Sequence, residues 1–147
     1  MGPDAVKRKT DGVVVATVVV LYACVTGGCA SQDSDLRALE SCGSLRFPAG
    51  TELAEYENQT AFGDEVMVAV VEVPASEFNE FKIGSNIDRF NPGVPESWKY
   101  YWRNTENFPA LGSQRAEHVD EGGVSQTRWV AHSSEGASDL VFIRAAC

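Results

Sequence analysis

Apolar residues first concentrate near the amino end of the chain. A nearly unbroken apolar run extends from Val13 to Val25, interrupted only by Thr17. Three basic residues, 7–9, precede this run, and three small residues, 26–28, follow it. Basic residues, a short apolar segment and small residues at a cleavage site form, in this order, the pattern of a secretory signal peptide. The pattern predicts export, with residues 1–28 as the signal peptide.

Beyond this run, the periodicity changes to that of strands. Residues 51–57 alternate polar with apolar side chains, which predicts a half-buried strand. Residues 65–73 are almost continuously apolar and rich in β-branched side chains, which predicts a central strand. Pro74 ends that strand because it has no N–H for the ladder. Residues 75–83 then predict a short amphipathic helix, with Ser76 as its cap and two phenylalanines facing the sheet.

The last third of the chain contains three alternating segments, separated by turn compositions rich in glycine and acidic residues. They cover residues 113–119, 125–133 and 139–146. Such a series predicts a three-stranded antiparallel meander. Strands, a helix and further strands together predict a single α+β domain: an antiparallel sheet with one or two short helices on one face.

The segment between the predicted signal peptide and this domain is polar and acidic. Residues 31–41 contain only scattered apolar side chains. Low hydrophobicity and excess charge are typical of segments that do not fold. We therefore expect a flexible tether over residues 29–41, with at most a short helical turn around Leu36 to Leu39, and an extracytoplasmic α+β domain over residues 42–147.

The residues at the end of the predicted signal peptide indicate how the exported chain is processed. Gly27, Gly28 and Cys29 resemble the lipobox of bacterial prolipoproteins, in which small residues directly precede a cysteine. Thr26 stands where that family usually has Leu or Val. In the family, the cysteine thiol receives a diacylglyceryl group and cleavage makes this cysteine the amino terminus. The resemblance implies lipidation of Cys29 and anchoring to the outer, extracytoplasmic face of the cell membrane.

Cys24 is the alternative lipidation site, because residues 21–24 also resemble a lipobox apart from the bulky Tyr22. The cysteine count favours Cys29. Lipidation there leaves Cys42 and Cys147 as a pair, whereas lipidation of Cys24 leaves three thiols in an oxidising compartment. We expect a disulfide between Cys42 and Cys147, with two buried free thiols as the alternative.

A membrane-spanning anchor that is never cleaved is a further alternative. The uncharged stretch covers residues 12–32, close to the ~20 residues that a spanning helix needs. Its last third, however, is small and polar, so the apolar part has only the length of a signal-peptide core.

A second resemblance concerns the strand–Pro–helix segment. Residues 66–81 are similar to part of small uncharacterised lipoproteins from high-GC Gram-positive bacteria. This resemblance implies the same cellular compartment as those lipoproteins, but it implies no biochemical activity.

The negative net charge of the chain limits which classes of binding partner are expected. The chain has a formal net charge of −9, and removal of residues 1–28 takes away three basic and two acidic side chains, which gives −10. An acidic domain repels nucleic acid and anionic lipid headgroups. We therefore expect no nucleic-acid partner, and membrane attachment through the diacylglyceryl-cysteine anchor. The domain is also too short for a two-lobed solute receptor.

The residues that could support catalysis are sparse. The only histidines are His118 and His132, which the predicted turns place near Gln126 and near Leu140, respectively. This pairing predicts two solvated or edge histidines that do not face each other, and therefore no metal site and no cofactor. Ser133 adjoins His132, but neighbouring strand residues point to opposite faces. No Gly-x-Ser-x-Gly motif occurs, so no catalytic residue is predicted.

An aromatic cluster is the one suggestive feature of the mature part. If residues 98–103 are helical, Trp98, Tyr101 and Trp102 share one face. They could fill the core or form a contact surface, for example for glycans. The sequence favours a non-enzymatic binding or accessory module of the cell envelope, with its protein or glycan partner left open. A small extracytoplasmic enzyme, which would need His132 and nearby acids, is the alternative, and a structural protein without a ligand is a third.

Overall fold

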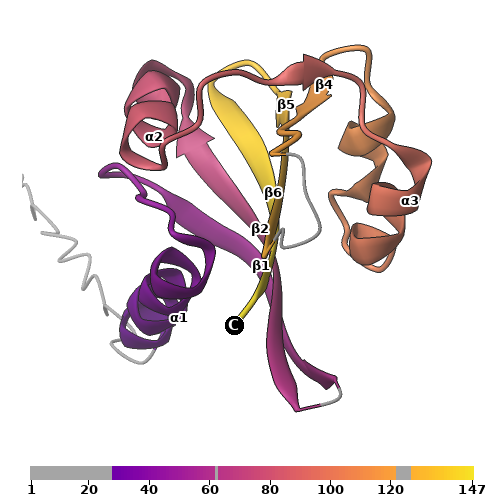
Figure 1. Cartoon of the computed structure of the whole chain (residues 1–147). Helices are drawn as coiled ribbons and strands as arrows, with labels where there is room; N and C mark the ends of the chain where they lie inside the picture. Colours follow the sequence, from indigo (N-terminus) through magenta and orange to yellow (C-terminus); the bar gives the residue numbers. More distant parts are fainter. Residues whose placement is uncertain (1–27, 62, 122–126) are drawn as a thin grey trace, which may run out of the picture.

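A six-stranded antiparallel sheet forms the centre of the molecule (Figure 1). The computed structural model describes residues 28–61, 63–121 and 127–147. The spatial order of the strands is β1-β2-β6-β5-β4-β3. Their bounds are β1 Glu52–Ala61, β2 Asp64–Pro74, β3 Asn91–Pro92, β4 Ala116–His118, β5 Arg128–Ser134 and β6 Ser138–Ala146. The predicted α+β class with an antiparallel sheet is confirmed, and so is the meander, formed by β4, β5 and β6.

Helices cover both faces of this sheet rather than one face. Helices α1 (Gly28–Gly43) and α2 (Phe78–Gly84) lie on one side, and α3 (Glu96–Lys99) lies on the other (Figure 1). Short 3-10 turns extend the cover: η1 (Ala75–Glu77), η2 (Tyr100–Trp102) and η3 (Phe108–Gly112). The expectation of helices on a single face is therefore wrong. The inner strands are apolar on both faces, as the burial along residues 66–71 shows, and each face needs its own cover.

Two hydrophobic cores result, one on each face. The α1–α2 core contains Leu39, Val71, Phe81, Val130 and Ile143, among others. The Trp102 core contains Val68, Val70, Trp102, Leu111 and Phe142, among others. Successive residues of a strand contribute to opposite cores, as the alternation of strand side chains requires.

Helix α1 replaces the tether that the acidic composition predicted over residues 29–41. Leu36 and Leu39 lie three residues apart on one helix face, and Leu39 is fully buried against the sheet. The carboxyl end of the helix is held by Arg128, whose Nη1 donates to the carbonyls of Gly43 at 3.0 Å and Ser44 at 2.8 Å. These bonds satisfy carbonyls that a helix end leaves without intrahelical partners. The segment is thus part of the folded domain.

A disulfide between Cys42 and Cys147 fastens the same helix to the end of the sheet. The two Cα atoms are 5.4 Å apart, within the usual range for a bridged pair, and the residues are 105 positions apart in sequence. The expected pairing of these two cysteines is therefore present in the structure.

The predicted helix after Pro74 is present as η1 followed by α2. Its start differs from the prediction, because no side chain caps either element and the Ser76 hydroxyl lies near the Glu77 carboxylate instead. Phe81 is fully buried and its ring stacks on that of Phe47, with centroids 5.8 Å apart. The helix therefore delivers its aromatic face to the α1–α2 core, as expected.

Candidate functional site

Strand register brings one histidine between two carboxylates. His132 on β5 pairs with Glu117 on β4 and with Val141 on β6. Directly paired residues point to the same face of a sheet. Asp139 precedes Val141 by two residues in the same strand, so it points to that face as well. Three separate strands thus place Glu117, His132 and Asp139 side by side.

The two ring nitrogens of His132 each face one of these carboxylates. Nε2 lies 2.9 Å from Oε2 of Glu117, a hydrogen-bonding distance. Nδ1 lies 3.4 Å from Oδ1 of Asp139, a charge contact without hydrogen-bond geometry. The side chains of His132 and Asp139 are only 8% and 6% exposed, whereas that of Glu117 is 38% exposed. The imidazole is therefore hydrogen-bonded at Nε2, while Nδ1 is buried without a hydrogen-bond partner among the described residues.

Aromatic side chains enclose the imidazole. The ring centroid of Phe78 lies 4.5 Å and that of Phe90 lies 4.4 Å from the His132 centroid. Beside these rings is a cavity of about 570 Å³, here called the His132 pocket. Its walls consist of Ala75, Phe78, Asn79, Lys82, Arg89, Phe90, Glu117, His132, Ser134 and Asp139. The size is within the range of about 300–1,000 Å³ that is usual for small-molecule sites.

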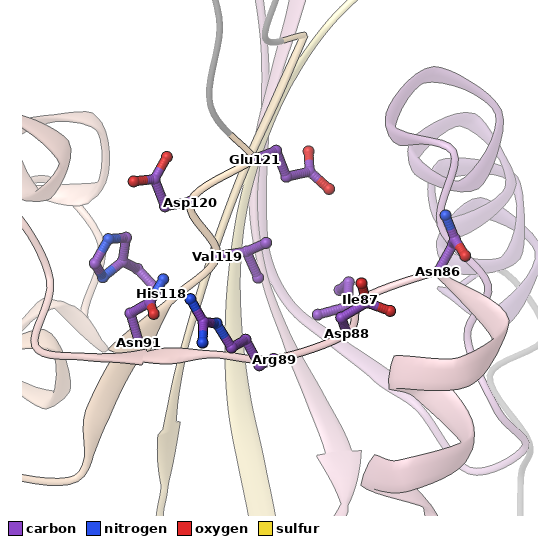
Figure 2. Close-up of a pocket in the computed structure, with 9 residues that line it drawn as sticks. All are labelled: Asn86, Ile87, Asp88, Arg89, Asn91, His118, Val119, Asp120 and Glu121. Carbon is purple, nitrogen blue, oxygen red and sulfur yellow. The ribbon is translucent and has the colours of Figure 1, made fainter.

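A second cavity of about 880 Å³ adjoins this pocket and is shown in Figure 2. It lies between the connection 86–91 and the end of β4 at residues 118–121. Figure 2 shows Asp120 and Glu121 on one side and Asp88 and Arg89 on the other. Arg89 borders both cavities. We call the second cavity the 86–91 cleft.

One acidic wall of the 86–91 cleft has a structural partner. Glu121 accepts hydrogen bonds from Nε of Arg128 at 2.9 and 3.0 Å, and the same guanidinium holds the end of α1. Charge-assisted bonds of this kind are about twice as strong as neutral ones. The carboxylate of Glu121 is therefore occupied in the folded domain.

The prediction of two solvated or edge histidines is wrong for His132, which is buried. His132 pairs with Val141, next to the expected Leu140, whereas His118 pairs with Ala131 and not with a residue near Gln126. Strand β4 ends at His118 and β5 begins at Arg128.

His118 lies on the opposite face from His132, so the expectation that the two rings do not face each other holds. Its Nδ1 is 2.7 Å from the Gly93 carbonyl, and its ring packs edge-on against Trp98 with centroids 5.0 Å apart. His118 is thus a partly buried packing residue that also borders the 86–91 cleft.

The aromatic contact surface requires a correction at its centre. Trp102 is fully buried, and its Nε1 donates to the carbonyl of Ile143 at 3.1 Å. Trp98 and Tyr101 are half-buried and pack on the same core. Because burial removes Trp102 from solvent, it cannot form part of a contact surface. Tyr100, which is 59% exposed, is the aromatic residue of this segment that points outward.

The lipidation sites lie at the edge of what the structure describes. Cys29 belongs to the first turn of α1, as judged from its backbone. Cys24 and residues 1–27 lie outside the described residues, as does Gln126. Among the described helices, none is long and apolar enough to cross a membrane.

The chemistry available to the site is limited to what these residues hold. Within the described ranges, no group of His, Cys, Asp and Glu is arranged to hold a metal ion. Ser133 points away from His132 and donates to Glu135 at 3.0 Å, so no serine–histidine pair forms. Sequence reasoning named His132 but missed Glu117, Asp139, Lys82 and Arg89. Comparison with protein-family models, curated proteins and solved structures finds no match to this chain.

Proposed function

We propose that this protein is an exported, lipid-anchored binding module on the outer face of the cell membrane, and that its ligand site is the His132 pocket. The observation that carries the proposal is the buried imidazole of His132, which Glu117 holds at Nε2 and which two aromatic rings wall beside a cavity. Such a preformed concave site with a few converging polar groups is the usual form of a small-molecule site.

The compartment is supported by the disulfide together with the amino-terminal pattern. A bridge between Cys42 and Cys147 suits an oxidising space and would be kept reduced in the cytosol of most organisms. The signal-peptide pattern and the lipobox resemblance at Cys29 agree with that compartment. Two acyl chains suffice for stable attachment, which the acidic surface would not provide.

The helical form of residues 29–41 changes how such an anchor would hold the domain. Leu36 is the first residue of α1 that packs on the core. From Cys29 to Leu36, a rise of about 1.5 Å per residue gives roughly 10 Å. A lipid on Cys29 would therefore hold the domain close to the bilayer rather than at the end of a flexible chain.

Binding is favoured over catalysis because neither ring nitrogen of His132 is presented to a substrate: Nε2 is bonded to Glu117, and Nδ1 is buried. A general base needs to reach the proton that it removes, within about 3 Å. Both nitrogens of His132 instead face protein carboxylates, and the ring is buried between Phe78 and Phe90. Among the described residues, no hydroxyl or thiol forms a nucleophile–base pair with this ring.

A small extracytoplasmic enzyme is the second candidate, and one observation favours it. Glu117 is 38% exposed at the mouth of the pocket, and it is held by His132, which Asp139 contacts in turn. A carboxylate held in this way could act as a general acid or base. In this case Glu117, and not His132, would meet the substrate.

Mass analysis of the mature amino terminus tests the anchor. We expect a diacylated Cys29 as the first residue. The Cys29→Ala variant should remain an unlipidated precursor that keeps its apolar segment 13–25. The matched control is Cys24→Ala, which should be processed like the wild type. A wild-type chain that keeps residues 1–28 and carries no lipid would contradict the lipid anchor and favour the uncleaved span.

Native mass spectrometry separates the binding module from the enzyme. The exported full chain is incubated with the low-molecular-mass fraction of the cell envelope, and we expect a non-covalent adduct that is released unchanged. Asn79→Trp should remove the adduct because the larger side chain fills the pocket. Glu80→Trp, on the next exposed position of α2 and outside the pocket, is the control.

Two results of this experiment would count against the module. Release of a chemically altered compound by the wild type, but not by Glu117→Gln, would favour the enzyme. An adduct that persists in Asn79→Trp would exclude the His132 pocket as the site.

A further inference from the structure

We infer that the His132 pocket selects a small organic acid, with the ligand carboxylate on Lys82 and Arg89 and its apolar body against Phe78 and Phe90. This inference rests on the proposed function, since it specifies the ligand class of the same pocket. It follows from how the charged groups of the pocket are paired.

The two cations of the pocket have no protein partner in the part of the chain that the structure describes. Lys82 lies on α2, and Arg89 lies on the connection that follows it. Neither side chain makes a hydrogen bond or ion pair there, whereas Lys99 and Arg128 each bind a glutamate. Two unpaired cations on one cavity attract an anion and repel a cationic ligand.

The carboxylates of the pocket are occupied by the imidazole. Glu117 is bonded to Nε2 of His132 at 2.9 Å, and Asp139 lies 3.4 Å from Nδ1. Glu117 is thus bonded to the imidazole and Asp139 is buried beside it, and neither carboxylate is paired with one of the two cations. The charges of Lys82 and Arg89 therefore remain available to a ligand.

The remaining walls define the rest of the ligand. Asn79 and Ser134 add an amide and a hydroxyl, which can donate to further oxygens. Phe78 and Phe90 provide an apolar wall continuous with the buried imidazole. A guanidinium binds planar carboxylates through paired N–H groups. The combination fits a carboxylate attached to a compact apolar or aromatic body.

The net charge of the protein makes this local arrangement necessary for an anionic ligand. With a formal charge of −9 for the chain, the overall field does not attract anions from a distance. An anion is then retained by cations at short range, here the half-buried Lys82 and the exposed Arg89 at the border of the pocket. Lys82 and Arg89 are placed to do this.

The test compares 3-phenylpropionate with 3-phenylpropanamide, a neutral probe of nearly the same shape. The exported full chain, solubilised in detergent, is titrated with each probe and followed by NMR signals of Phe78 and Phe90. We expect the acid to bind at least about tenfold more tightly than the amide, as one charge-assisted contact provides. Lys82→Gln and Arg89→Gln should each weaken acid binding by about tenfold and leave amide binding unchanged.

Arg115→Gln is the matched control, because Arg115 is exposed and borders neither the His132 pocket nor the 86–91 cleft. It should leave both affinities unchanged.

Equal binding of acid and amide, with both abolished by Asn79→Trp, would overturn the inference while the binding pocket stands. Absence of any shift at Phe78 and Phe90, together with no envelope adduct, would overturn the proposed function itself. Displacement of the acid by equimolar inorganic phosphate would show a simple anion site and also overturn the organic-acid assignment.

Discussion

The two faces of the sheet are both covered by helices, yet they are built differently. On the α3 side, the cover is anchored by Trp102, which packs edge-on against Phe142 with centroids 5.9 Å apart and has its one polar atom satisfied. On the α1–α2 side, the buried layer includes His132 and Asp139. A disulfide and the Arg128 hydrogen bonds fasten α1 to the sheet there. One face is an apolar core, and the other combines a core with a polar cluster.

The difference indicates which face carries function. Burial of charged groups is costly, and an apolar replacement of similar shape is often at least as stable. The Trp102 core shows that this sheet can pack an apolar layer against its helices. A buried imidazole between two carboxylates on the other face is therefore not required for folding alone. Its position at a cavity is consistent with the proposed role in holding a ligand site.

The largest loss of folding stability is expected on the face that contains the Trp102 core. Trp102→Ala removes the largest fully buried side chain and should lower the free energy of unfolding by about 3–5 kcal/mol, measured by urea denaturation. Tyr100→Ala, at an exposed position in the same turn, is the control and should cost less than about 1 kcal/mol. Equal losses in the two variants would mean that Trp102 does not anchor this cover.

The next largest loss of folding stability is expected on the α1–α2 face, when its disulfide is removed. Loss of the Cys42–Cys147 bridge in Cys42→Ser should cost roughly 2–5 kcal/mol, because the bridge closes a long loop in the unfolded chain. Hydrogen exchange should increase in α1 more than in η2, since only α1 is tied by the bridge. The double variant Cys42→Ser/Cys147→Ser should match the single one. A stability unchanged from the wild type would show that the bridge is dispensable.

The difference between the faces was partly readable from the sequence. The continuous apolar run 65–73 correctly predicted an inner strand, and the meander was correctly placed. In the same run, both the odd-numbered and the even-numbered positions carry apolar side chains, so both faces of the strand require a cover. The prediction did not include a cover on the second face. In residues 29–41, the segment from Leu36 to Leu39 indicated at most a short helical turn, whereas α1 covers the whole segment and packs these two leucines on the core from one face.

The polar cluster was not predictable, for a physical reason. Glu117, His132 and Asp139 come from three strands and meet only through strand register. Register depends on how many residues each connection uses, and a slip of one residue moves a side chain to the other face. The signal that was available is local: His132 follows the apolar pair Val130–Ala131 in a strand, which favours burial over exposure.

A smaller effect on folding stability is expected from the contact between His132 and Asp139 in this cluster. In a double-mutant cycle of His132→Gln and Asp139→Asn, we expect a coupling of about 0.5–3 kcal/mol, because each group is buried and faces the other. The cycle of His132→Gln with Lys99→Gln, on the opposite face, should be additive within about 0.5 kcal/mol. Additivity in the first cycle as well would mean that the 3.4 Å approach contributes nothing to stability.

The smallest effect concerns the helix cover of the α1–α2 face at high pH. Burial raises the pKa of Tyr56 above its ordinary value of about 10, and the nearby charges of Asp35 on α1 and Glu65 raise it further. The folded protein thus holds this proton more tightly than the unfolded chain does. The resulting stabilisation is complete below about pH 10 and is lost as pH rises through the folded-state pKa.

Tyr56→Phe should therefore lose less stability than the wild type when pH rises above about 10, as measured by urea denaturation across that range. Asp35→Asn should shift the phenolate absorbance of Tyr56 toward lower pH, because one of the charges that raises its pKa is removed. An unchanged titration in Asp35→Asn would show that α1 does not lie over Tyr56 in solution. The cover of this face would then depend on the disulfide and on Arg128 rather than on the packing of the whole helix.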